Sequence, residues 1–162
     1  MLKLLPCLVL MSTSALACDG GPLFELMDAP LPLQAGETFD VAEVQSTEGG
    51  EWKVYFAQDG KTVQNLERHD YGEGGRWVAL LIVSSPDAYA IRNTTYGYSA
   101  PNYVLGATTI REETDIFIFC AGKLYLPAEE FGLDPGYRKK AADALKTFDA
   151  PEVAKYVSGL KR

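Results

Sequence analysis

The sequence predicts an α+β fold, in which a twisted antiparallel β-meander carries two C-terminal helices packed on one face. Short runs of β-branched and aromatic residues follow one another closely between residues 38 and 126, with turn residues between them. No helical pattern separates these runs, and parallel strands would need long crossovers of that kind. Apolar residues then recur at helical spacing in residues 137–160. Strands that all precede the helices indicate one antiparallel sheet covered by helices.

Residues 1–17 have the three-part pattern of a cleaved secretory signal peptide. Lys3 supplies the positive charge, residues 4–11 form a short apolar run, and small residues lead to a cleavage site after Ala17. The apolar run is about half of the roughly 20 residues that a membrane-spanning helix needs. We therefore expect a periplasmic or secreted protein without a transmembrane segment, whose mature chain begins at Cys18.

Cys18 has two alternative roles. Cys7 is removed with the signal, so Cys18 and Cys120 are the two cysteines of the mature chain, and an even count in an oxidising compartment favours a disulfide bond between them. The alternative is a lipid anchor on Cys18 in a structural protein of the envelope. Ala15 and Leu16 stand in the reverse of the order usual for such an anchor, so the disulfide is the favoured interpretation.

Residues 18–35 are expected to form an extended segment, followed by a single α+β domain at residues 36–162. Pro30 and Pro32 argue against both a helix and a central strand in the segment. Within the domain, Asp59-Gly60 predicts a tight hairpin turn. The strands are expected at residues 38–44, 52–57, 62–69, 77–83, 89–91, 103–105, 116–120 and 123–126.

Two helices are expected at the C-terminal end. Asp134 can cap the first, with Pro135 in its first turn. Residues 149–152 have the pattern of a capping box, which predicts a second helix that ends near Leu160.

The chain is acidic, and its charge is unevenly distributed. The formal net charge is −7; residues 18–136 hold 19 acidic and 7 basic side chains, whereas residues 137–162 hold 3 acidic and 7 basic ones. An acidic body argues against binding to nucleic acid, whose affinity depends on phosphate neutralisation. It favours a basic partner instead, such as an envelope-degrading enzyme that this protein would restrain.

His69 is the only histidine and the main candidate for catalysis. Together with Asp70 or Glu73 it could act as the general base of a hydrolytic enzyme. However, Asp70 is adjacent in a strand and would point to the other face. His69 is itself expected to be exposed and unpartnered at a strand end, and no glycine-flanked serine or spare thiol offers a nucleophile. The sequence therefore favours a protein that is not an enzyme, with the hydrolase as the alternative.

No metal or cofactor site is predicted. One histidine and two cysteines are too few for a zinc site. The acidic residues 112–115, which are expected in a solvated hairpin turn, lack the spacing of a calcium-binding loop. The glycine pairs match neither dinucleotide-binding nor phosphate-binding loops.

Three tyrosines are the first candidates for binding. Tyr96, Tyr98 and Tyr103 fall within residues 93–103, an expected loop rich in small and turn-forming residues. Tyrosines in such loops supply rigid contact surface that is apolar on the ring and polar at the hydroxyl. This pattern predicts a non-catalytic binding domain that recognises a protein or a glycan of the envelope.

Three cations near the start of the first helix are the second candidates. The helix dipole disfavours Arg138, Lys139 and Lys140 at that place, which indicates a compensating anion. Glu129 and Glu130 or acidic side chains of the sheet would provide it within the chain, and an anionic ligand is the alternative.

Overall fold

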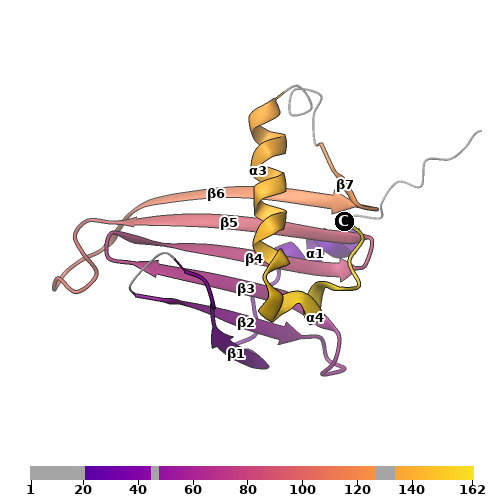
Figure 1. Cartoon of the computed structure of the whole chain (residues 1–162), viewed down its shortest axis with the longest axis horizontal. Coiled ribbons are helices and arrows are strands. Elements are labelled where there is room, and N and C mark those ends of the chain that lie inside the picture. The colour runs from indigo at the N-terminus through magenta and orange to yellow at the C-terminus, as the bar shows by residue number, and fades with distance from the viewer. Residues whose placement is uncertain (1–20, 45–47, 127–133) are drawn as a thin grey trace, which may run out of the picture.

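The computed structural model describes residues 21–44, 48–126 and 134–162. Its centre is a seven-stranded sheet in which each strand pairs antiparallel with the next along the chain (Figure 1). The C-terminal helices cross one face of this sheet, so the predicted α+β meander is confirmed. The strands are β1 (Glu37–Asp40), β2 (Gly50–Phe56), β3 (Val63–Gly72), β4 (Gly75–Ser85), β5 (Ala88–Tyr98), β6 (Thr109–Cys120) and β7 (Lys123–Leu124).

Alternation along the strands gives the sheet two different faces. The register places Leu66 opposite Leu81, Leu81 opposite Ile91, and Ile91 opposite Phe117, so these side chains share one face. This face, called the helix face below, is covered by α3 (Pro135–Lys146), by two 3₁₀ turns (Thr147–Asp149 and Pro151–Val153) and by α4 (Ala154–Val157). The other face is called the open face.

The helix face holds the larger hydrophobic core. Phe148, in the turn that follows α3, is fully buried and its ring lies 5.8 Å from the ring of Trp52. Ala141 and Ala144 bring α3 close to the strands because their side chains are small. The helical layer therefore contacts the sheet both through α3, whose Tyr137 ring lies 5.3 Å from that of Phe117, and through the turns that follow it.

A helix, α1 (Gly21–Asp28), occupies part of the segment that was expected to be extended. That expectation was wrong, because a proline restricts its own residue and the one before it, and Pro30 lies beyond the end of the helix. Pro22 lies in the first turn, where helices tolerate proline. Leu23 is fully buried and anchors α1 on one end of the open face, against the second core cluster of Leu80, Ile82 and Ala90.

β5 and β6 form a longer hairpin than the sequence predicts. Residues 103–105 lie in the loop between them rather than in a strand, and residues 112–115 lie within β6 rather than in a turn. The hydroxyls of Thr94 and Thr114 are 3.1 Å apart across this pair. The two errors have opposite causes: the outer half of the hairpin is polar and does not stand out as an apolar run, whereas residues 103–105 in the loop are apolar and resemble a strand.

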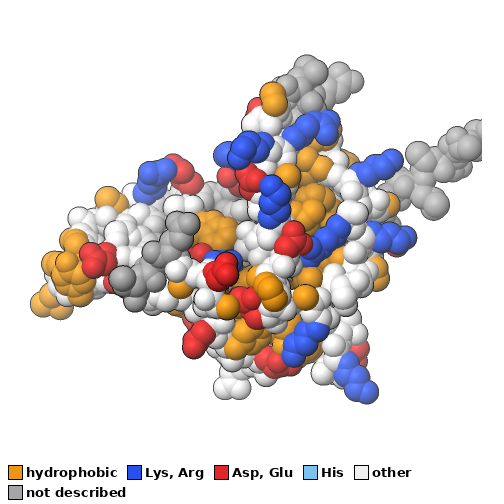
Figure 2. Space-filling view, in the orientation of Figure 1, with side chains coloured by type: hydrophobic (Ala, Val, Ile, Leu, Met, Phe, Trp, Pro, Cys, Tyr) orange, Lys and Arg blue, Asp and Glu red, His pale blue; other side chains and the backbone are white. Residues whose placement is uncertain are grey.

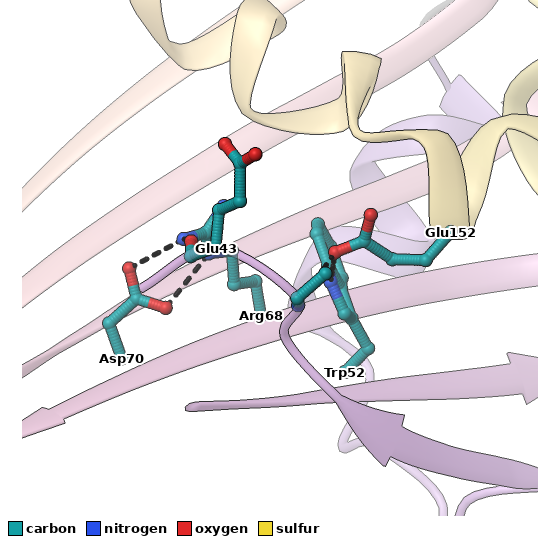
Figure 3. A network of polar contacts seen from close by, with 6 residues as sticks. Glu43, Trp52, Arg68, Asp70 and Glu152 are labelled. Carbon is teal, nitrogen blue, oxygen red and sulfur yellow. Dashed lines mark hydrogen bonds and ion pairs between the residues drawn. The ribbon is translucent and has the colours of Figure 1, made fainter. Parts of the chain in front are cut away.

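The first C-terminal helix agrees with the prediction and the second does not. The Asp134 carboxylate accepts a hydrogen bond of 2.7 Å from the Gly136 amide at the start of α3. Glu152, however, does not cap the next helix: its Oε1 accepts from the Ala42 amide and from Trp52 Nε1, each at 3.2 Å. The predicted capping box is thus replaced by a tertiary contact to β2 (Figure 3), and α4 has only four residues.

Arg68 is the centre of a second polar contact beneath the C-terminal turns (Figure 3). Its guanidinium donates to both carboxylate oxygens of Asp70 at 2.8 and 3.0 Å and to the Glu43 carbonyl at 3.2 Å. The same group lies 5.6 Å from the ring of Trp52 and 5.9 Å from that of Trp77. A charged side chain is thereby held between two indoles and a carboxylate.

Within the described part of the chain, no helix has both the length and the apolar character needed to cross a membrane.

Candidate functional site

The three candidate tyrosines do not share one loop. Tyr96 and Tyr98 belong to β5 and are half-buried, whereas Tyr103 follows in the loop and is 72% exposed. The guanidinium of Arg76 lies 4.3 Å from the centre of the Tyr96 ring and covers it. The expected loop at residues 93–103 is therefore wrong for its first half, and Tyr103 is the freely exposed tyrosine of the three.

Residues 99–108, called the hairpin tip below, join β5 to β6 and extend past the neighbouring turns (Figure 1). Apolar side chains gather at this end of the molecule (Figure 2). Leu105 is fully exposed, Tyr103 is 72% and Val104 43% exposed, and Ile110 at the start of β6 is 69% exposed. Exposed apolar side chains that gather in one place are uncommon on protein surfaces and are typical of sites that contact another molecule.

Hydrogen bonds hold the backbone of the hairpin tip in place. The Asn102 amide donates to the Glu73 carbonyl at 2.9 Å, and the Asn102 side chain donates to the Glu48 carboxylate at 2.6 Å. The Ser99 amide donates to the Thr108 carbonyl at 2.8 Å, which closes the base of the loop. Gly106, with φ of 87°, provides a left-handed turn that other residues rarely adopt. The apolar side chains are therefore presented on a preformed loop.

The three candidate cations lie on α3, over the helix face, and are Arg138, Lys139 and Lys140. Tyr96 is on the open face. Lys140 pairs with Asp115 of β6 at 3.1 Å, and Lys139 pairs with Asp143 one turn along the helix at 2.6 Å. For Lys140 the compensating anion thus comes from the acidic sheet. Arg138 is exposed in the first turn, and the alternative partners Glu129 and Glu130 lie outside the described residues.

His69 is neither exposed nor unpartnered, so that expectation was wrong. It lies within β3 between β2 and β4, its side chain is 13% exposed, and its Nε2 is 3.1 Å from Glu67 Oε2. Asp70 points to the helix face and binds Arg68, as alternation predicts. Glu73 is exposed in the turn between β3 and β4. The carboxylate that the fold brings to His69 is therefore that of Glu67, two residues before it on the same face.

Polar side chains of β2 and β3 form a row on the open face, made of Glu51, Tyr55, Glu67, His69 and Tyr71. Glu67 is the more buried of its two carboxylates. Its side chain is 12% exposed. Burial raises the pKa of Glu67, but the hydrogen bond and charge of His69 and the hydroxyl of Tyr55, which donates at 3.0 Å, outweigh it and lower the pKa. Next to it, Tyr71 donates to Glu51, and burial together with that carboxylate raises the pKa of Tyr71. The row is therefore a set of ionised carboxylates with neutral tyrosines.

Three buried nitrogen atoms on the open face lack a hydrogen bond of good geometry among the described residues. They are His69 Nδ1, His69 Nε2, which lies at ion-pair distance from Glu67, and Arg76 Nε. Buried polar atoms are rarely left unpaired without a functional reason or a bound water molecule. Beside this row the open face has a hollow of about 340 Å³, lined by Arg92, Glu112 and Tyr96 among others.

The sequence did not identify Arg92 and Glu112 as candidate binding residues. Alternation along residues 88–98 does place Arg92, Thr94 and Tyr96 on one face, which could have indicated a shared surface. It could not show which face was covered, since that depends on where α1 and α3 pack. Among the described residues no group of histidine, cysteine, aspartate and glutamate side chains lies close enough to hold a metal ion.

Comparisons with models of protein families, with curated proteins and with solved structures find no match to this chain.

Proposed function

We propose that this protein is an exported, non-catalytic binding domain that recognises a protein of the envelope through its hairpin tip. The observation that carries the proposal is the exposure of Tyr103, Val104 and Leu105 on the hairpin tip and of Ile110 beside it in β6. Apolar side chains of this size contribute most when a partner buries them. A glycan would be expected to need more polar groups around the aromatic rings than this tip offers.

The preformed backbone of the tip supports insertion into a cleft. Binding is weakened by the ordering of mobile loops, and the hydrogen bonds of Asn102 and Ser99 reduce that cost. The proposed partner therefore offers an apolar cleft shaped for a rigid loop.

The surrounding charges specify the rim of that cleft. Among the described residues, Glu48, Glu73 and Glu113 lie at this end of the sheet, together with the cations Arg76 and Arg111. Because the whole chain carries −7, a rim of lysine and arginine side chains would favour and accelerate association.

Substitutions at the tip test this proposal. Leu105→Ser and Tyr103→Ala are expected to keep the free energy of unfolding within about 0.5 kcal/mol, because both side chains are exposed. Each should reduce at least tenfold the retention of basic proteins from a periplasmic extract on the immobilised chain. Tyr125→Ala is the matched control, because it removes an aromatic ring that is 48% exposed near the other end of β6, and this variant should retain them. Equal retention by the tip variants and the control would contradict the proposal.

Export and the disulfide bond are parts of the same proposal. The predicted signal peptide and Cys18 lie outside the described residues, whereas Cys120 is at the end of β6. We expect the mature chain to begin at Cys18, with Cys18 bonded to Cys120. An alkylating reagent should then increase the intact mass of the chain only if the disulfide bond has first been reduced. Alkylation of both thiols without reduction, or an added acyl mass, would show that the bridge is absent.

A further inference from the structure

The hollow on the open face contains two charged side chains that the fold leaves unpaired. Arg92 of β5 is half-buried and Glu112 of β6 is exposed, and both line the hollow. Neither makes a hydrogen bond, ion pair or ring contact with any residue that the structure describes. A partly buried guanidinium without a partner is unfavourable, so proteins usually pair it.

The neighbouring residues show that pairing was available on this strand. Arg111 and Glu113, which flank Glu112 and point to the other face, form a bidentate ion pair at 2.8 and 2.7 Å. Arg92 and Glu112 face the same hollow and do not meet. An occupant with one anionic and one cationic group would satisfy both.

The register sets the distance between the two charges. Arg92 is paired with Ile116, and Glu112 is paired with Tyr96. Their Cα atoms are therefore four residues apart along the strands, about 13 Å at roughly 3.3 Å per residue. Both side chains are long, so the space left between their charged groups fits a short linker.

The lining of the hollow combines three aliphatic side chains with polar ones, among them the Glu67 carboxylate, which is paired with His69. Val78 and Leu80 of β4 and Ile116 of β6 line the hollow, and Ile116 is 41% exposed although it is a large aliphatic residue. The hydroxyls of Thr94 and Thr114 lie within hydrogen-bond distance of each other. An aliphatic linker would cover Ile116 and gain free energy from that burial.

We propose that this hollow binds a small aliphatic zwitterion, a molecule whose carboxylate and ammonium groups are joined by a short apolar linker. The carboxylate binds the guanidinium of Arg92 and the ammonium group binds the carboxylate of Glu112. Free lysine and a C-terminal lysine of a peptide both have this chemistry, because an aliphatic chain separates the ε-ammonium group from the carboxylate. The volume of about 340 Å³ is at the lower end of ligand sites and suits a molecule of that size. This site is independent of the hairpin tip and goes beyond the proposed function.

Three probes of equal chain length separate the two charges. 6-Aminohexanoic acid carries both, hexanoic acid only the carboxylate, and hexylamine only the ammonium group. By titration calorimetry on the folded mature chain, 6-aminohexanoic acid is expected to bind saturably, and each single-charge probe at least tenfold more weakly, because one charge-assisted contact is lost. Absence of saturable binding, or equal affinity for all three probes, would overturn the proposal.

Substitutions then assign each charge to its residue. R92Q and E112Q should each weaken binding of 6-aminohexanoic acid at least tenfold, and both variants should fold because neither side chain makes a hydrogen bond or an ion pair with the described residues. R111Q and E113Q change the same charges on the opposite face of β6 and should bind as the unmodified chain does. Equal losses in these controls would show that net charge, rather than the hollow, determines binding. The tip variant Leu105→Ser should leave this affinity unchanged, so this test is separate from that of the protein-binding proposal.

Discussion

Replacing Phe148 with alanine is expected to lower the free energy of unfolding by about 3–5 kcal/mol. The side chain is fully buried, and its ring packs against that of Trp52 at 5.8 Å. Truncation would leave a cavity where the helical layer meets the sheet. The C-terminal turns depend on that contact, whereas α3 also contacts the strands through Ala141, Ala144 and Tyr137, whose ring lies 5.3 Å from that of Phe117.

Chemical denaturation of Phe148→Ala and of Phe24→Ala measures this effect. Phe24 lies on α1 and is 49% exposed, so its truncation should change stability by only about 0.5–1 kcal/mol. Near-ultraviolet circular dichroism should report the altered surroundings of Trp52. A loss below about 1 kcal/mol for Phe148→Ala would mean that the C-terminal layer is not fastened at this point.

Arg68→Met is expected to lower the free energy of unfolding by about 2–3 kcal/mol. Methionine keeps an unbranched apolar side chain between the indoles of Trp52 and Trp77, but it removes the charge that holds Asp70. Breaking a fully buried ion pair costs about 3–5 kcal/mol. The side chains of Arg68 and Asp70 are 16% and 25% exposed, so solvent reduces the effect.

The chain contains a matched control for this prediction. Arg111 and Glu113 form the same bidentate pair, also two residues apart on a strand, but their side chains are 63% and 62% exposed. Arg111→Met should therefore lower the free energy of unfolding much less than Arg68→Met does. A double-mutant cycle of Arg68→Met with Asp70→Asn should give a coupling energy well above that of Arg111→Met with Glu113→Gln. Equal coupling in the two cycles would show that burial between the indoles adds nothing.

Local sequence determined the elements with strong local signals. The apolar run 77–83 became the buried centre of β4, and Asp134 with Pro135 marked the start of α3. The close succession of strands determined the antiparallel meander, because short connections leave no room for parallel crossovers. Alternation also placed His69 and Asp70 on opposite faces, since neighbouring residues of a strand point in opposite directions.

Tertiary structure decided the features that depend on residues distant in sequence. Glu152 has the spacing of a capping residue, yet the packing of the C-terminal turns brings it to Trp52, 100 residues earlier. α1 is held by the burial of Leu23 rather than by a helical pattern. Neither contact can be predicted from a short stretch of sequence, because the two partners come together only after the sheet has formed.

The same division applies to the candidate sites. Sequence by itself identified the aromatic segment that contains Tyr103 and the acidic character of the body, because both are properties of composition. Only the register of β5 with β6 placed Tyr96 in a strand and Tyr103 on the tip. Only the positions of α1 and α3 decided that Arg92 and Glu112 lie on the face with the hollow. A strand pattern specifies which side chains share a face, whereas the packing of helices, which depends on the whole chain, specifies which face stays open.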